Sequence, residues 1–399
     1  MTDLLPATIQ PPRGNLDFAL ADFLARWGGR TRHDLSASES APLLLSSLLQ
    51  MAGTDDQRRW DALDLGYADP HGSPWLRSAI ADRHPGLDAS NVLCCAGAQE
   101  GLTCVMRALL APGDHAVVVV PIYQPAEQAV TSVCEATGVA LRDQDNWQLD
   151  IQKVAAAIRP ATRLVLVNFP NSPTGATIAP AALASLVALC RHHGLWLVND
   201  EVYRSVGSDP ATRTPPVAEI YEQGISIDGV SKGFGLPGLR VGWILCKDQA
   251  LLAKFLLAKS ALSSCLAKPS DVLAHIALKA EAGIVGRNRA IAHANREHLR
   301  AVLHHHSDIL EQPVLNDAVL AFPRYHGADG ADRFAQRLAR DAGVLVFPSS
   351  LWHSPLATVP PDRLRIGLGR VEAGPALTAL DEYLTAYRKT GAASQARPT

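Results

Sequence analysis

Two basic side chains in one short stretch could support covalent chemistry on a phosphorylated ligand. Lys232 lies in a loop of small residues with almost no charge, and Arg240 follows eight positions later between glycines. A lysine without an adjacent carboxylate can lose its proton on burial, and the free amine is a nucleophile able to form a Schiff base. A guanidinium offers a planar pair of donors that suits a phosphate. The alternative is a solvated lysine on a glycine-rich surface loop.

A carboxylate at the end of a buried strand adds a third group. Residues 195–199 are mostly apolar and lead into Asp200, with Tyr203 three positions on. A buried aspartate beside a pyridine nitrogen keeps that nitrogen protonated, and a protonated ring is an electron sink that makes a Cα proton acidic. The imine-forming lysine, the phosphate-binding arginine and this carboxylate together indicate pyridoxal 5'-phosphate (PLP). The alternative for Asp200 is a helix cap.

An anion site is predicted at another strand end. The apolar residues 92–96 read as a strand, and Gly97, Ala98 and Gln99 follow where a helix begins. The first amides of a helix have no partners within the helix, so they can bind a phosphate. Tyr123 lies just past the next buried strand.

These motifs resemble those of the class I/II aminotransferase family of PLP enzymes. The family pattern of Ser-Lys, a glycine-rich spacer and Gly-x-Arg-x-Gly matches residues 231–242. The resemblance covers roughly residues 35–385 and implies a fold-type I homodimer whose sites are built from both subunits. It implies that Lys232 forms the imine, that Gly97, Ala98, Gln99, Ser231 and Arg240 surround the phosphate, and that Tyr123, Asp200 and Tyr203 contact the ring.

The turn at residues 168–175 is similar to the family's Asn-Pro-x-Asn-Pro-Thr-Gly turn but departs from it at one position. Ser172 is aligned with the second family asparagine, which hydrogen-bonds the ring oxygen of the cofactor, and Asn171 precedes it. A serine can donate a hydrogen bond, but its side chain is shorter. Either Asn171 shifts to make the contact, or Ser172 makes a weaker one.

Further contacts follow from the resemblance, each with a simpler alternative. Arg365 lies between apolar residues, where its charge needs a buried partner; the family implies the substrate α-carboxylate, and the alternative is a structural ion pair. Ser38 and Glu39 are expected substrate contacts, because the family's equivalent loop lines the substrate pocket, but the loop also reads as a turn. Tyr67 is implied to reach the cofactor phosphate of the neighbouring subunit, and the alternative is a core tyrosine.

Alternating apolar strands and helices predict an α/β protein with a mainly parallel sheet flanked by helices, plus a smaller α/β domain. Ligand sites in such sheets lie at the carboxyl ends of the strands. Ala98, Tyr123, Asn171, Asp200 and Lys232 all follow predicted strands. We expect an N-terminal arm and part of the small domain in residues 1–45, the large PLP-binding domain in 46–280, the small C-terminal domain in 281–390 and a disordered tail in 391–399.

Composition narrows the class of protein. The chain has 399 residues, and 37 basic against 39 acidic residues leave a net charge of −2, which gives no indication of nucleic acid or membrane binding. Seven cysteines without a CxxC pair favour free thiols in a reducing compartment, and no signal peptide or membrane span is evident, so a soluble cytoplasmic protein is expected. The run His304 to His306 is not expected to bind a metal, because three consecutive residues cannot converge on one ion.

The motifs predict an enzyme acting on a free amino acid through an imine with the cofactor, and they leave its reaction open. Within the family, residues 167–170 and 231–243 are most similar to the guanidino-amino-acid cyclases of antibiotic biosynthesis, of capreomycidine or streptolidine type. This implies β-elimination and intramolecular cyclisation of a hydroxylated arginine, with Lys232 as general base and a carboxylate such as Glu39 facing the guanidinium. The alternatives are an ordinary aminotransferase with a 2-oxo acid acceptor and a ligand-binding pseudoenzyme.

Overall fold

The computed structural model describes residues 18–206, 213–312, 314–316 and 318–395. The expected arm at residues 1–14 and the last four residues of the expected tail lie outside these ranges. All seven cysteines are described and are unpaired. In the described part of the chain, no helix combines the length and the apolar character needed to cross a membrane.

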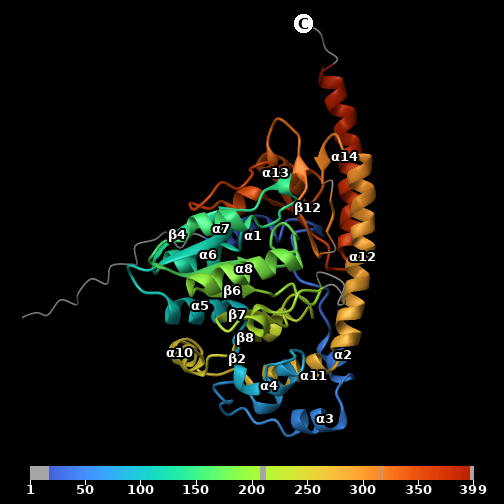
Figure 1. Cartoon of the computed structure of the whole chain (residues 1–399). Coiled ribbons are helices and arrows are strands. Elements are labelled where there is room, and N and C mark those ends of the chain that lie inside the picture. Colours follow the sequence, from blue (N-terminus) through green and yellow to red (C-terminus); the bar gives the residue numbers. More distant parts are fainter. Residues whose placement is uncertain (1–17, 207–212, 313, 317, 396–399) are drawn as a thin grey trace, which may run out of the picture.

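A seven-stranded sheet forms the centre of the molecule (Figure 1). In spatial order its strands are β2 (Val92–Cys95), β8 (Gly242–Cys246), β7 (Gly224–Gly229), β6 (Trp196–Asp200), β5 (Thr162–Asn168), β3 (His115–Val120) and β4 (Glu135–Ala140). Strand β8 runs antiparallel to both of its neighbours, and all other pairs are parallel. The predicted mainly parallel sheet is confirmed.

Helices cover both faces of this sheet, which explains its continuous apolar strands. In β3, Val118 and Val120 pack into the core on one face, and Val117 and Val119 pack into the core on the other. Because successive side chains of a strand point to opposite faces, a run of valines requires a cover on each side. One face is covered by α5 (Ala98–Leu109), α6 (Gln124–Thr131) and α10 (Gln249–Ser260), and the other by α7 (Ile151–Ala157), α8 (Pro180–His193) and α9 (Val217–Ile220).

A third core packs beside the β2 and β8 edge of the sheet. It contains residues of β2 and β8 and of neighbouring helices, and Trp243 is among its largest fully buried side chains. The helices at this edge are α2 (Leu45–Leu49), α3 (Thr54–Asp61), α4 (Pro74–Ala81) and α11 (Lys268–Lys279). Ser73 caps α4, since its side chain accepts a hydrogen bond from the amide of Leu76.

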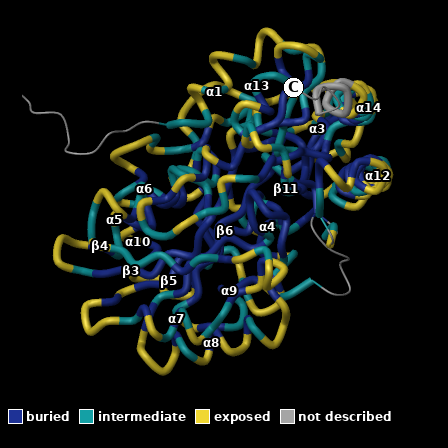
Figure 2. Tube along the Cα trace, turned by 90° about the horizontal axis from the view of Figure 1, so that it is seen from above, coloured by how far each residue is buried: buried dark blue, intermediate teal, exposed yellow. Residues whose placement is uncertain are grey.

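A smaller group of elements packs against two long helices and forms the second part of the molecule. Helices α12 (Glu281–His305) and α14 (Ala373–Gln395) run side by side along one flank (Figures 1 and 2). With them pack α1 (Ala19–Trp27), α13 (Ala331–Asp341) and three small sheets: β1 (His33–Asp34) with β12 (Val344–Leu345), β9 (Leu310–Glu311) with β11 (Arg324–Tyr325), and β14 (Leu364–Gly367) between β10 (Leu320–Ala321) and β13 (Phe347–Pro348). Figure 2 shows most of the central strands buried and the outer turns of the helices exposed.

Residues 343–348 contain two short strands rather than one, because β12 pairs with β1 and β13 pairs with β14. One boundary differs from the sequence-based expectation. Helix α14 does not stop near residue 390 but continues to Gln395, so residues 391–395 are not the disordered tail that we expected. Alanine, which has the highest helix propensity, occupies two of these added positions.

Candidate active site

The carboxyl ends of the central strands surround a cavity of about 450 Å³. Residues that follow β2, β3, β5, β6 and β7 reach it, and residues from the small sheets close it from another side. Of the predicted residues, it is lined by Ser38, Glu39, Ala98, Gln99, Tyr123, Ser172, Asp200, Tyr203, Ser231, Lys232, Arg240 and Arg365. Gly97, Asn171 and Tyr67 are not on its wall.

Lys232 is half-buried and hydrogen-bonded. Its Nζ donates to the Oγ of Ser38 at 2.7 Å, lies 4.0 Å from the Oε2 of Glu39 and lies 5.9 Å from the ring centroid of Tyr203. The sequence shows no acid beside Lys232, but the fold brings Glu39 to it from a distant part of the chain. The amine is therefore held at the cavity by neighbours that no local motif contains.

Asp200 is buried at the end of β6 and 5% exposed. Its Oδ1 accepts a hydrogen bond from the amide of Val202 at 3.3 Å, so it caps the following turn as well as lining the cavity. Burial raises the pKa of Asp200 to about 6, because the charged form is poorly solvated there. A protonated ring nitrogen in the cavity would supply the missing counter-charge, so Asp200 fits the role expected of it toward PLP.

The start of α5 and Arg240 form a cradle that suits a phosphate. Gly97 precedes α5 with φ +87°, and a Cβ at this position would overlap the Nη2 of Arg240. A Cβ at Gly242 would likewise overlap the amide nitrogen of Ala98. The two glycines therefore allow the guanidinium and the unpaired first amides of a twelve-residue helix to approach each other, which is the arrangement that an anion needs.

Replacing Gly97 with alanine is expected to weaken cofactor binding by about tenfold or more. The added methyl pushes the end of a flexible arginine aside, which costs the fold little but moves a phosphate donor. The measurement is the dissociation constant of PLP from the apo-protein. Gly113→Ala is the matched control, because Gly113 has a similar φ of +94° but open space around its Cβ position. An equal loss of affinity in both variants would mean that backbone strain alone is responsible.

The turn after β5 separates Asn171 from Ser172. The side chain of Asn171 is enclosed in the turn, where its Nδ2 donates to the carbonyl of Pro121 at 3.0 Å and its Oδ1 accepts from the hydroxyl of Thr174 at 2.7 Å. Ser172 lines the cavity, and so does Asn168, which the sequence analysis missed as a site residue. Asn168 is the last residue of β5, and this place at the carboxyl end of a strand is the sequence feature that could have indicated it as a site residue. Of the two alternatives for this turn, the shift of Asn171 toward the cavity is not seen, and Ser172 is the residue on the cavity wall.

Arg365 lies on β14 and is 3% exposed. Its guanidinium lies 4.8 Å from the ring centroid of Phe347 and 5.0 Å from that of Trp352, and its Nη2 donates to the carbonyl of Ser36. No carboxylate of the described residues forms an ion pair with it, and burial lowers its pKa. The alternative of a structural ion pair is therefore not what the structure shows. A buried guanidinium that faces a cavity is suited to a carboxylate ligand.

The loop carrying Ser38 and Glu39 is fixed by backbone hydrogen bonds from the two residues that follow it, which bind two different segments of the chain. Ser40 donates to the carbonyl of Lys232 at 3.0 Å, and Ala41 donates to the carbonyl of Gly369 at 2.9 Å. The carboxylate of Glu39 also pairs with Arg370, which follows β14 and lines the cavity. Sequence reasoning missed Arg370, although it follows Arg365 by only five positions.

Two further predictions concern residues away from the cavity. Tyr67 is 91% exposed, so it is not a core tyrosine, and it lies on the surface near residues 265–269. His305 and His306 both lie within hydrogen-bonding distance of one carboxylate of Asp381, at 3.3 Å and 2.7 Å. These contacts join residues 305 and 306 to α14. The ligand atoms of His305, His306 and Asp381 lie within 4.8 Å of one another, a grouping that could hold a metal ion, so the expectation that these histidines bind no metal stays a prediction.

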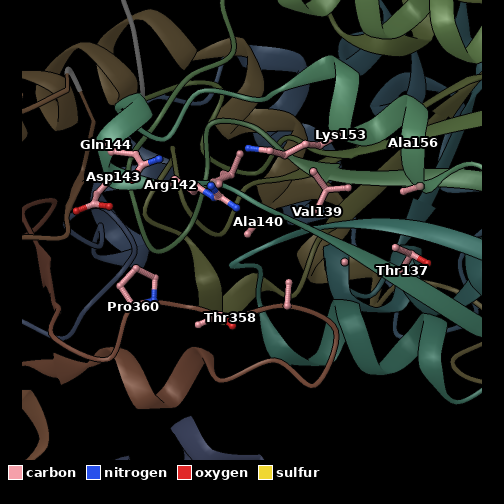
Figure 3. A pocket seen from close by; sticks show the side chains of 14 residues that line it. Thr137, Val139, Ala140, Arg142, Asp143, Gln144, Lys153, Ala156, Thr358 and Pro360 are labelled. Carbon is pink, nitrogen blue, oxygen red and sulfur yellow. The ribbon is translucent and has the colours of Figure 1, made fainter.

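A larger cavity of about 630 Å³ lies elsewhere, between β4, α7 and residues 357–360 (Figure 3). Its charged side chains include Arg142, Asp143 and Lys153, and none of the predicted site residues lines it. Asp143 is already paired with Arg363. Volume alone would select this cavity, but the smaller one has the buried carboxylate, the amine and the guanidinium.

The chain is similar to PLP enzymes along most of its length. The sequence profile described as "Aminotransferase class I and II" matches residues 61–374. Capreomycidine synthase of Streptomyces vinaceus is 28% identical over 326 residues, which are 80% of each chain. Arginine–pyruvate transaminase AruH of Pseudomonas aeruginosa is 35% identical over 187 residues, 45% of this chain and only 47% of that protein. A crystal structure of the PLP-dependent cyclase OrfR in complex with Au superposes with a TM-score of 0.83 at 26% identity and covers 96% of this chain and 100% of the other.

Proposed function

This chain belongs to the class I and II aminotransferase family and is a PLP-dependent enzyme, and from that premise we propose that it removes a β-hydroxyl group from a guanidino amino acid and closes a ring. The observation that carries this proposal is that the cavity wall contains the carboxylate of Asp34 as well as the guanidinium of Arg365, while the other carboxylate of this loop, Glu39, is already paired with Arg370. Asp34 accepts hydrogen bonds from the amide and hydroxyl of Ser36 and forms no ion pair within 4.0 Å among the described residues, although its charge acts on Arg365 at longer range. A substrate with a carboxylate at one end and a guanidinium at the other finds opposite charges for both.

The cofactor has a residue for each of its parts. We propose that Arg240 and the first amides of α5 hold the phosphate, that Tyr123 packs on the ring, and that Asp200 faces the ring nitrogen. Tyr203, Ser172 and Asn168 are the candidates for the ring oxygen. Bound PLP supplies the electron sink that makes the substrate Cα proton acidic.

The side chains of the cavity account for the steps of the proposed reaction. Arg365 holds the α-carboxylate, which orients the Cα–H bond. Lys232 removes the Cα proton as general base, the Cβ–O bond breaks, and the oxygen leaves as water after it receives a proton. A guanidine nitrogen then adds to Cβ and gives up one proton to the neutral amine of Lys232, which delivers a proton to Cα. The net change is a hydroxylated amino acid to a cyclic amino acid and one water.

Transamination is the second candidate. The relative named arginine–pyruvate transaminase favours it, because the same cavity would then hold arginine and pass its amino group to a 2-oxo acid. Lys232, Asp200 and Arg365 would act in the same way in this reaction. Since the chain is an enzyme of this family, the alternative of a pseudoenzyme is set aside.

A second copy of the chain is proposed to complete the site. Tyr67 is exposed and does not reach the cavity of its own chain, and the large apolar side chains of Leu44, Leu45 and Leu65 are exposed as well. Such exposed apolar groups are typical of an interface. We propose a homodimer in which the Tyr67 of each chain reaches the phosphate of its partner.

Incubation with 3-hydroxyarginine in the absence of any 2-oxo acid tests the proposal. We expect a cyclic product that has lost one water and retains its α-amino group, detected by mass spectrometry and NMR. Arginine, which has no β-hydroxyl, is the matched control and should give no cyclic product. If 3-hydroxyarginine is unchanged while arginine with pyruvate yields alanine, the protein is a transaminase and the cyclase proposal is wrong.

A further inference from the structure

The hydroxyl of Ser38 lies beside the amine of Lys232, although the two residues are 194 positions apart in the sequence. It accepts the hydrogen bond from the Nζ of Lys232 at 2.7 Å. Because a hydroxyl can accept and donate at the same time, accepting from Lys232 leaves its own proton free to be donated. No acceptor for that proton is found among the described residues, and Ser38 lines the substrate cavity. Its donor is therefore available to a ligand.

The position of this hydroxyl is well determined by its surroundings. The amide of Ser38 donates to the Oε2 of Glu39 at 3.2 Å, and the other oxygen of Glu39 is paired with Arg370. The next residue, Ser40, is bonded through its amide to the carbonyl of Lys232 itself. The hydrogen bond of Ser40 therefore holds the loop at a fixed place beside Lys232. Glu39 and Arg370 are positioning residues for Ser38.

Glu39 is not suited to donate the proton that a leaving hydroxyl needs. Burial alone would raise its pKa, but the charges of Lys232 and Arg370 outweigh burial and hold the pKa of Glu39 below its ordinary value. Glu39 is therefore an anion at neutral pH and has no proton to give. Among the described residues, Ser38 provides the hydroxyl that is hydrogen-bonded to the amine of Lys232.

We propose that Ser38 is a catalytic residue that relays a proton from Lys232 to the β-oxygen of the substrate. This rests on the proposed elimination. After Lys232 has taken the Cα proton, one N–H proton passes to the Oγ of Ser38 while the proton of Ser38 passes to the β-oxygen. The Cβ–O bond breaks with its electrons on oxygen, the electron pair left at Cα forms the double bond to Cβ, and water leaves. Ser38 ends the step with one proton, as it began.

This role separates two events that both depend on Lys232. Removal of the Cα proton does not need Ser38, whereas departure of the β-hydroxyl does. Transamination contains the first event but not the second. The ratio of Cα proton exchange to water loss is therefore a measure of Ser38 that a change in the overall fold would not alter.

The test compares Ser38→Ala, Ser38→Thr and Ser40→Ala with the wild type on 3-hydroxyarginine in D2O. Ser40 is the matched control, because it lies in the same loop and is buried, but its hydroxyl contacts no partner. We expect Ser38→Ala to lower water loss by about 100-fold, the lower end of the range for one proton-transfer group. Exchange of the Cα proton should stay within about threefold, and the dissociation constant of PLP from the apo-protein should be unchanged. Ser38→Thr, which keeps a hydroxyl, and Ser40→Ala should retain the wild-type ratio.

The possible outcomes are distinct. If Ser38→Ala loses exchange and water loss in equal measure, or keeps both, the relay is wrong although the cyclase proposal stands. If Ser40→Ala changes the ratio as much as Ser38→Ala does, the effect belongs to the loop and the relay is again wrong. If the wild type exchanges the Cα proton but releases no water, the proposed function itself fails, and the relay fails with it.

Discussion

Replacing Lys232 with alanine is expected to abolish turnover, with a loss on the order of 10⁴-fold or more. In the proposed mechanism the residue combines two roles, since its amine would bond covalently to the cofactor and later remove the Cα proton, and a general base alone contributes about 10² to 10⁴. The Nζ of Lys232 lies in the cavity within reach of Ser38 and Glu39, so no other amine of the described residues replaces it there. The measurements are the rate with 3-hydroxyarginine and the site of labelling after borohydride reduction, located by peptide mass spectrometry.

Lys153→Ala is the control for this variant. Lys153 lines the larger cavity (Figure 3). It forms a surface pair with Asp150 at 3.2 Å. We expect it to leave turnover and labelling unchanged. Labelling of Lys153 instead of Lys232, or more than a tenth of wild-type turnover in Lys232→Ala, would place the chemistry elsewhere.

Asp200→Asn is expected to have opposite effects on catalysis and on the stability of the apo-protein. Activity should fall by about 10³-fold or more, because asparagine cannot supply the charge that keeps a ring nitrogen protonated. Stability should rise at neutral pH, since burial raises the pKa of Asp200 to about 6 from an ordinary value near 3.8. A raised pKa means that the folded state tolerates the carboxylate poorly, at a cost of roughly 3 kcal/mol when the group is ionised.

The sign of the pH dependence follows from the same shift. Below about pH 4 the carboxyl group is protonated in both the folded and unfolded states, so wild type and variant should differ least there. The wild type loses the contribution of this group as the pH rises from about 4 to 6, and the difference is constant above that. Urea unfolding of both apo-proteins between pH 5 and 8 measures this difference in the free energy of unfolding. A variant that is less stable than wild type at pH 8 would contradict the reasoning.

Asp228→Asn is the matched control for Asp200→Asn. Asp228 is also buried at a strand end, and burial raises its pKa to about 7. One of its oxygens has no hydrogen-bond partner, and the residue does not line the cavity. We expect a similar gain in stability at pH 8 with most of the activity retained. This pair of variants separates the cost of burying a carboxylate from its catalytic use.

The meeting of Lys232, Asp200 and Tyr123 at one cavity could be predicted from the sequence. Lys232 and Tyr123 follow a strand and Asp200 ends one, and the strands of a mainly parallel sheet bring their ends together. The end of α8 was also predictable, because a glycine, Gly194, follows its last residue, and glycine favours the left-handed conformation that ends many helices. In the structure Gly194 has this conformation, with a φ of +62°. A short sequence motif was sufficient to predict the position of a residue wherever that motif alone determined the local turn.

The half of the site that binds the substrate could be predicted only in part. The contact of Ser38 with Lys232 spans 194 positions, and that of Glu39 with Arg370 spans 331. Both depend on irregular loops, which have no periodicity to reveal their neighbours. Asn171 and Ser172 show a related limit, since spacing identified the turn but not which side chain faces the cavity.

The bonds that tie residues 40 and 41 to Lys232 and Gly369 have a consequence for synthesis on the ribosome. The sheet that carries the phosphate cradle and Asp200 is complete once residue 246 has emerged, whereas the wall containing Arg365 and Arg370 requires more than a hundred further residues. Chains generally fold in the order in which they are made. The strands that carry Asp200 and the phosphate cradle are therefore made well before the wall that holds Arg365 and Arg370, so an unfinished polypeptide lacks one side of the cavity.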